Sequence, residues 1–202
     1  MNRTRTYSMQ TRAAAAELTR DRILDAALDL FLERHYDDVS MREIAATAGV
    51  APQTVVNHFA TKEAVFVAAA FERFQGQTEE LRYRAAAGDI AAAVDALAAD
   101  YERTAGANAR LLAVEDRVPA VHEVLAEGRA VHRRWVERTF PNALAGLRGT
   151  ARKRRLAQLA SVTDASTWLL LRRDHGLAEA EAADAVRELI ESIHRKPKGS
   201  SQ

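Results

Sequence analysis

Apolar side chains recur every three or four residues along most of this 202-residue chain. A helix gathers positions with that spacing on one face, so the pattern predicts about nine amphipathic helices. The segments that carry it are residues 17–34, 40–48, 52–59, 62–86, 90–103, 109–116, 119–140, 151–174 and 178–194. Alanine is abundant, and the chain contains only 9 glycines and 4 prolines, which favours helix throughout. We therefore predict an all-α fold.

Residues 40–62 carry the most specific local pattern. Ser40 and Glu43 form a capping-box pair, which predicts the start of a short helix. Gly49 ends that helix, because glycine takes a positive φ without steric cost. Ala45 is small at the point where a following helix is expected to cross.

A second short helix is expected directly after this turn. Pro52 suits its first turn, where a backbone N–H has no partner to lose, and Val55 and Phe59 give it a buried side. Its polar residues remain on the other faces: Gln53, Thr54, Asn57 and His58. A small residue, a glycine four positions later and an aliphatic residue ten positions later match the spacing of a DNA-reading helix-turn-helix. An ordinary helical hairpin is the alternative.

Composition limits the other possibilities. The formal net charge is +1, so any affinity for DNA must come from the local placement of charge. With 0 cysteines, the chain has no disulfide, no thiolate metal site and no cysteine nucleophile. The longest apolar run, residues 64–71, is too short to span a bilayer, and the arginine-containing N-terminus lacks the apolar region of a signal peptide. We expect a cytoplasmic protein without membrane association.

The pattern divides the chain into four regions. Residues 1–16 are expected to form a flexible basic arm, which either follows the DNA minor groove or remains an untethered terminus. Residues 17–62 form a three-helix domain around the helix-turn-helix, and residues 63–195 form a larger helical domain. Residues 196–202 are polar, contain proline and glycine, and are expected to be a disordered tail.

The residues that identify the N-terminal domain most closely are 23–27, 30–31, 36, 44–45, 48–50, 54, 58–59 and 62–63. Over residues 18–66 they resemble the tetracycline-repressor (TetR) family of bacterial transcriptional regulators. Residues 167–174 and 176–177 also resemble the C-terminal region of many such regulators. The resemblance implies a homodimer whose second motif helices lie in the major groove of a double-stranded, palindromic operator. It further implies that an unknown small-molecule effector binds the larger domain and that the last two helices form the dimer contact.

The resemblance also assigns DNA contacts to individual residues, some to phosphates and some to base edges. Together with the polar faces described above, the expected DNA-binding residues are Ser40, Arg42, Pro52, Gln53, Thr54, Asn57, His58 and Lys62. Arg42 and Gln53 are the best base readers, because arginine bonds guanine and glutamine bonds adenine at two points, each worth ~1–3 kcal/mol of discrimination. His58 and Lys62 should position the protein on phosphates rather than specify sequence.

Three positions depart from the family pattern. His35 stands where glycine is usual, and Ala51 stands where serine often caps the second motif helix. Val56 replaces a tyrosine that usually holds a phosphate. These departures indicate either weaker DNA binding or compensation by Asn57 or the arm.

Aromatic residues of the larger domain suggest a place for the effector. Tyr101, Trp135 and Trp168 suit the walls of a pocket for a planar apolar ligand, although core or dimer interface is the more common role of such residues. The candidate effector-pocket residues are Tyr101, His122, Trp135, Asp164 and Trp168. The candidate dimer-interface residues are Trp168, Ala182, Val186, Leu189, Ile190 and Ile193.

An enzyme is the least favoured reading. His122 and Glu123 begin like a metalloprotease helix motif, but Ala126 stands where its second histidine is required. The chain offers no nucleophile–base pair, metal cluster or phosphate loop, so we expect no catalytic residue, metal or cofactor. The leading hypothesis is a repressor released from its operator by an effector. The alternatives are a ligand-independent or architectural DNA-binding protein and, more remotely, a helical-bundle enzyme.

Overall fold

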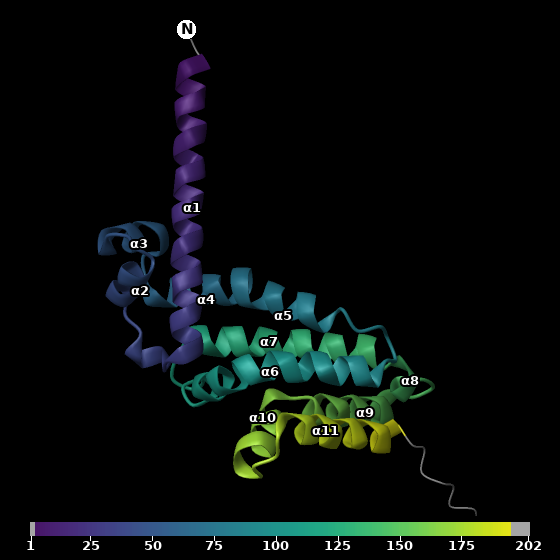
Figure 1. The fold of residues 1–202 in the computed structure, drawn as a ribbon. Helices are drawn as coiled ribbons and strands as arrows, with labels where there is room; N and C mark the ends of the chain where they lie inside the picture. Colours follow the sequence, from purple (N-terminus) through teal and green to yellow (C-terminus); the bar gives the residue numbers. More distant parts are fainter. Residues whose placement is uncertain (1–2, 195–202) are drawn as a thin grey trace, which may run out of the picture. The chain divides into compact units, whose positions relative to one another are not determined.

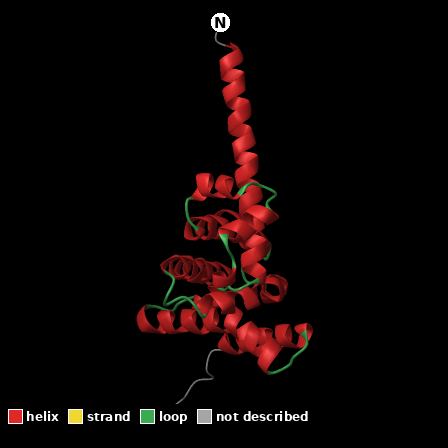
Figure 2. Ribbon diagram, turned by 90° about the vertical axis from the view of Figure 1, so that its left-hand side faces the viewer, coloured by secondary structure: helices red, strands yellow, loops and turns green. Residues whose placement is uncertain are grey.

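The computed structural model describes the backbone of residues 3–194 and the side chains of residues 13–194. Within that range every regular element is a helix (Figure 2), so the all-α prediction is confirmed. The expected tail at 196–202 and the beginning of the expected arm, residues 1–2, lie outside the described residues.

The chain folds into two compact units. Unit 1 contains the residues up to Gly76 together with Val114–Val124. Unit 2 contains Gln77–Ala113 and the residues from Leu125 onward. Unit 1 therefore includes residues that the expected boundary after Lys62 assigned to the second domain.

Unit 1 holds the N-terminal helices, labelled in Figure 1. They are α1 (Arg3–Glu33), the 3-10 turn η1 (Tyr36–Asp38), α2 (Met41–Thr47), α3 (Pro52–Phe59), α4 (Lys62–Ala69) and the π-helical segment η2 (Ala70–Phe74). Residues 3–16, expected as a flexible arm, continue α1 toward the N-terminus. The alanine run at residues 13–16 accounts for this continuation, since alanine has the highest helix propensity.

Three aromatic rings organise the core of unit 1. The ring of Phe31 stacks on Tyr36 at 5.7 Å between centroids and meets the edge of Phe66 at 5.0 Å. Tyr36 and Phe66 meet edge to face at 5.3 Å. Aromatic pairs in these arrangements contribute beyond the area they bury. The surrounding aliphatic side chains are completely buried: Ile23, Leu24, Ile44, Val55 and Val65.

Ion pairs also join α1 to η2. The guanidinium of Arg20 donates two hydrogen bonds of 2.6 Å to the carboxylate of Glu72. Arg73 donates from Nε to Asp25 at 2.9 Å and pairs with Asp21. Such two-point arginine–carboxylate contacts restrict geometry as well as adding attraction. They restrict rotation of η2 against α1.

Unit 2 is built on α6 (Ile90–Leu112), which packs against α10 (Ala165–Leu169) and α11 (Glu179–His194). The other elements that reach into it are α5 (Gln75–Arg82), α7 (Pro119–Thr139), α8 (Pro141–Leu144), α9 (Gly149–Val162) and the π-helical segment η3 (Leu170–Asp174). Figure 1 shows α9 and α11 side by side, and residue contacts join them.

Two expected helix boundaries were wrong. The expected break at Gly106 and Asn108 is absent, and α6 runs through to Leu112 instead of ending before a separate helix at 109–116. Glycine inside a helix costs only about 1 kcal/mol, and burial of Ala105 and Ala107 on either side offsets it. Conversely, the expected continuous helix 151–174 is interrupted after Val162.

A buried ion pair lies in the core of unit 2. Arg82 Nη2 lies 2.7 Å from Asp100 Oδ2, and the two side chains are only 9% and 1% exposed. The guanidinium also lies over the rings of Tyr101 and Trp135, at 4.9 and 5.7 Å from their centroids. Two charges removed from water are tolerated only when each satisfies the other, so this pair ties α5 to α6.

His132 joins this cluster in its neutral form. Its Nδ1 lies 3.1 Å from Arg82 Nη1, and because arginine can only donate, Nδ1 must accept. The ring proton therefore sits on Nε2, which donates to the carbonyl of Ala160 at 3.2 Å. Burial first, and then the charge of Arg82, lower the pKa of His132 to about 4.

Replacing Asp100 with alanine is expected to lower the free energy of unfolding by about 3–5 kcal/mol, because Arg82 would remain buried without a counter-charge. Chemical denaturation measures this change. Glu80→Ala is the matched control, since it removes an exposed partner of Arg84, and its loss should stay below about 1 kcal/mol. Small and equal losses in the two variants would contradict a structural role for the buried pair.

The His132 pKa predicts how stability depends on pH. Its folded value of about 4 lies below the ordinary value of 6.5, so the unfolded chain takes up a proton first as the pH falls. The free energy of unfolding should therefore decline between about pH 6.5 and pH 4, by up to about 3 kcal/mol. Urea titrations across this range should show a shallower decline in His132→Gln and the full decline in His122→Gln. A wild-type profile shared by both variants would rule out His132 as its cause.

Candidate DNA-binding site

A complete capping box begins α2. The Ser40 hydroxyl accepts from the Glu43 N–H at 3.2 Å, and the Glu43 carboxylate accepts from the Ser40 N–H at 2.9 Å. Hydrogen bonds from Arg34 and then from Ser40 lower the pKa of Glu43 to about 2. Glu43 thus stays charged and holds the first turn of α2 in place, as the sequence predicted.

Gly49 forms the turn between α2 and α3. Its φ of +65° is strained for other residues, although a Cβ there would meet no atom within 4 Å. Backbone conformation, and not lack of space, therefore requires glycine. The Val50 N–H donates to the Ala45 carbonyl at 2.9 Å and closes the turn.

The buried side of α3 points back toward α2 and α1. Val55 is 0% and Phe59 is 8% exposed. The N-terminal residue Ala51 provides no side-chain cap, and the first turn is closed by the Thr54 N–H donating to the Ala51 carbonyl at 2.8 Å. The departure at Ala51 thus removes a cap without disturbing the helix.

The opposite side of α3 is largely exposed within the part of the chain that the structure describes. Thr54 and His58 are half-buried at its flanks, and the exposed side chains are Pro52, Gln53, Val56 and Asn57. The Gln53 amide donates from Nε2 to Asn57 Oδ1 at 2.9 Å, which orients both amides on the same face.

Arg42 and Lys62, two side chains expected to contact DNA, differ in whether other groups of the protein hold them. Arg42 is exposed, and no carboxylate partner holds it among the described side chains. Lys62 donates from Nζ to the Tyr36 carbonyl at 2.9 Å and lies 4.3 Å from the centroid of the Tyr36 ring. Lys62 therefore supports the fold, and an ammonium group with three donors retains others for a phosphate.

Sequence reasoning missed a contact from a distant part of the chain. Arg117, in the segment Val114–Val124, makes an ion pair with Asp37 just before the motif. The hydrogen bond from Arg117 is the main cause of the lowered pKa of Asp37. The partners are 80 residues apart, so no local pattern could have indicated them. The ion pair partly neutralises the negative charge of Asp37.

The five expected effector-pocket residues lie in three different settings. Tyr101, Trp135 and Trp168 belong to the packed core of unit 2. Asp164 caps α10 by accepting from the Ser166 N–H at 2.8 Å. His122 lies in the segment that belongs to unit 1.

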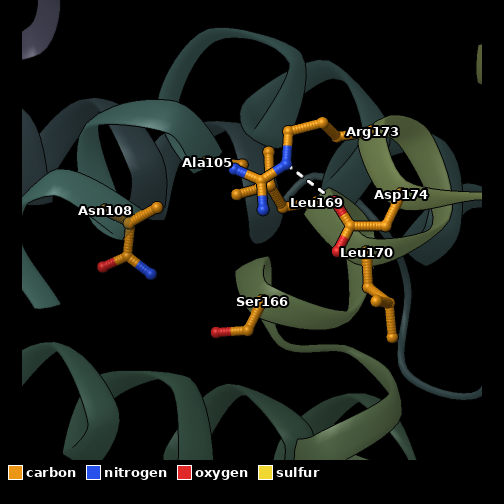
Figure 3. Close-up of a pocket in the computed structure, with 8 residues that line it drawn as sticks. Ala105, Asn108, Ser166, Leu169, Leu170, Arg173 and Asp174 are labelled. Carbon is orange, nitrogen blue, oxygen red and sulfur yellow. Dashed lines mark hydrogen bonds and ion pairs between the residues drawn. The ribbon is translucent and has the colours of Figure 1, made fainter. Parts of the chain in front are cut away.

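A pocket of about 250 Å³ lies elsewhere in unit 2, between α6 and the helix made by α10 and η3 (Figure 3). Its apolar residues are Ala105, Ala109, Leu169 and Leu170, and its polar residues are Asn108, Ser166, Arg173 and Asp174. Arg173 and Asp174 form an ion pair of 2.7 Å at its rim. Three of these residues lie in the π-helical segment, and π-helical turns often occur at functional sites.

Burial narrows the expected dimer interface. Trp168, Ala182, Val186 and Ile190 are each at most 3% exposed within one protomer, so a partner cannot cover them further. Leu189 is 41% exposed and remains available, with Ile193 partly exposed beside it.

Two further findings concern residues 3–194. No helix there combines the length and the apolar character needed to cross a membrane. Likewise, the described histidine, aspartate and glutamate side chains form no group of three or more that could hold a metal ion.

Comparisons with known proteins agree with the geometry of α2 and α3. Residues 23–69 match the family model of bacterial regulatory proteins, tetR family. The HTH-type transcriptional regulator UidR of Escherichia coli strain K12 is 39% identical over 61 residues. That alignment spans 30% of this chain and 30% of UidR, so it is confined to about a third of each protein.

Solved structures resemble nearly the whole chain. A candidate transcriptional regulator from Pseudomonas aeruginosa PAO1 has a TM-score of 0.67 and 14% identity, over 88% of this chain and 91% of its own. A transcriptional regulator from Rhodococcus sp. Rha1 has a TM-score of 0.65 and 22% identity, over 88% and 99%. At these identities the likeness establishes the fold, an N-terminal helix-turn-helix followed by a larger helical domain. The N-terminal domain of this chain, residues 23–69, thus matches the bacterial regulatory proteins of the tetR family.

Proposed function

We propose that this chain is a cytoplasmic, homodimeric, sequence-specific DNA-binding transcriptional regulator, and that a small-molecule effector releases it from its operator. The observation that carries the proposal is the exposed face of α3, which presents Gln53 and Asn57 to solvent. The burial of Val55 and Phe59 holds the same helix against the rest of unit 1. Such a helix fits the major groove, with its N-terminal residues at base edges. Repression is the role proposed for the bound state.

Each exposed group has a task in this proposal. Arg42 and Gln53 read bases, since guanidinium and amide groups can each bond one base at two points. Ser40 lies at the N-terminus of α2, where backbone N–H groups favour a phosphate. The remaining donors of Lys62 and the half-buried His58 position the protein on the backbone.

A second copy of the chain is the proposed partner, and the face formed by α9 and α11 is its proposed contact. Lys153 and Arg154 are exposed on α9, and no carboxylate in the described part of the protomer pairs with either. Glu188 and Leu189 are exposed on α11. An exposed leucine on a face that carries charges of both signs suits a self-complementary surface, in which the cations of one copy meet the anions of the other.

The pocket beside α6 is the proposed effector site. Its mixed lining suits a small molecule with one apolar side and a few polar groups. The chain leaves α6 directly into Val114–Val124 of unit 1, where Arg117 pairs with Asp37. A ligand that favours one arrangement of α6 would thereby shift the population of dimers whose motifs match half-sites ~34–36 Å apart.

A ligand-independent DNA-binding protein is the second candidate. The observation in its favour is that Tyr101, Trp135 and Trp168 all belong to the packed core of unit 2. The reciprocal titration described below separates this candidate from the first.

Selection of operator sequences by the purified protein tests the DNA-binding proposal. The wild-type protein should select a palindromic sequence. Arg42→Ala and Gln53→Ala should each lose preference at a defined position of the half-site, by ~1–3 kcal/mol per base contact. Arg84→Ala, at an exposed arginine in unit 2, is the control and should leave the selected sequence unchanged. Unchanged preference in both Arg42→Ala and Gln53→Ala would refute the assigned readout.

Reciprocal titration tests the effector. Compounds that raise the melting temperature in a small-molecule screen should bind less tightly to the protein–operator complex, and should weaken operator binding by the same factor. Asn108→Leu, which alters the pocket lining, should reduce binding of such a compound while leaving operator affinity unchanged. A tight-binding compound without any effect on operator affinity would contradict release by an effector, and the absence of any stabilising compound would favour the ligand-independent candidate.

A further inference from the structure

An exposed apolar side chain borders the polar surface of α3. Val56 is 41% exposed, although Val55 and Phe59, about 100° and 60° from it around the same helix, are almost completely buried. Among the large hydrophobic residues described in unit 1, only Leu18 and Val56 are exposed to this extent. An exposed valine does not stabilise the isolated chain, because only burial of such a side chain would contribute about 1.5–3 kcal/mol to the free energy of unfolding.

The polar side chains beside Val56 indicate which base lies near it when α3 is in the major groove. Gln53 donates one amide hydrogen to Asn57, which leaves its second amide hydrogen and its oxygen directed away from that partner. One donor beside one acceptor is the pattern that bonds adenine at N7 and N6 in the major groove. The Gln53–Asn57 hydrogen bond thus holds an adenine-reading amide next to an apolar group.

Helix geometry relates the two positions. Val56 follows Gln53 by three residues, which moves it about 4.5 Å along the helix axis and about 60° around it. Successive base pairs of DNA lie about 3.4 Å apart. If Gln53 bonds one base, a displacement of this size directs Val56 toward a neighbouring base step and not toward the same base.

The chemistry of the groove then selects the target. Valine has no hydrogen-bonding group, so it gains nothing from a phosphate or from the polar edges of adenine, guanine or cytosine. Thymine alone presents an apolar group in the major groove, its C5-methyl. We propose that Val56 contacts the C5-methyl group of a thymine next to the adenine bonded by Gln53, and so contributes to sequence specificity. This proposal rests on the DNA-binding function proposed above.

Substituting deoxyuridine for each thymine of the selected operator, one at a time, tests it, because the exchange removes only the methyl group. The wild-type protein should lose about fourfold in affinity at one position of each half-site, the effect of one buried methyl group. Val56→Ala should bind the unmodified operator about fourfold more weakly and should be indifferent to deoxyuridine at that position. Fluorescence anisotropy with labelled duplexes measures both effects.

Two control variants make the result specific. Gln53→Ala should remain sensitive to deoxyuridine at the position assigned to Val56, because it removes a different base contact. Leu112→Ala, at an exposed leucine in unit 2 that does not line the pocket, should bind every duplex as the wild type does. Melting temperatures should be equal for Val56→Ala and the wild type, since the side chain is exposed, and this comparison excludes misfolding.

The possible outcomes distinguish the role proposed for Val56 from the DNA-binding function on which it rests. An operator that is selected normally, with no thymine whose deoxyuridine effect disappears in Val56→Ala, overturns the role of Val56 and leaves the DNA-binding function intact. Failure of the wild-type protein to select any sequence overturns both proposals.

Discussion

The close crossing of α2 and α3 is the constraint on which the exposed face of α3 depends. Ala45 is completely buried at this crossing, and a larger side chain would push the helices apart. Gly49 supplies the one positive φ that lets the chain turn within so short a distance. Once these two conditions are met, burial of Val55 and Phe59 decides the rotation of α3. The face with Gln53 and Val56 is exposed as a consequence, not as an independent feature.

Unit 2 is held by a different principle. Its apolar core contains a charged pair, Arg82 and Asp100, whose removal from water is unfavourable until both groups are fully satisfied. Replacing a whole buried pair with apolar side chains of similar volume is often neutral or stabilising, so the pair is weak evidence for added stability. The hydrogen bonds to His132 can form with only one tautomer of its ring and one orientation of the ring. We infer that this cluster of Arg82, Asp100 and His132 favours one arrangement of the helices in unit 2.

Local chemistry explains which parts of the fold could be predicted. The capping box at Ser40, the positive φ at Gly49 and the proline at the start of α3 each involve residues within a few positions, and each is confirmed. Helix breaks were less certain, because burial can outweigh propensity. Gly106 lies inside a helix for that reason. At Asp164 the capping signal was present, but the apolar pattern around it indicated a continuous helix.

Contacts between distant segments were beyond prediction. The pair of Arg117 with Asp37 and the pocket that joins Asn108 to Ser166 depend on how helices pack in three dimensions. The five expected effector-pocket residues illustrate the same limit. Aromatic character identified Tyr101 and Trp135 as buried, but the pattern of the sequence cannot distinguish the wall of a cavity from solid core.

The segment Val114–Val124 limits where the chain can be cut into independently folding fragments. The chain enters unit 1 a second time through this segment, and Val114, Val118 and Val121 are buried there. A fragment ending at Gly76 would lack these side chains and leave their apolar neighbours uncovered. Unit 1 is therefore not a detachable module. A chimera that transfers it to another regulator must also carry residues 114–124, and recombination at a single point in the gene would separate parts that fold together.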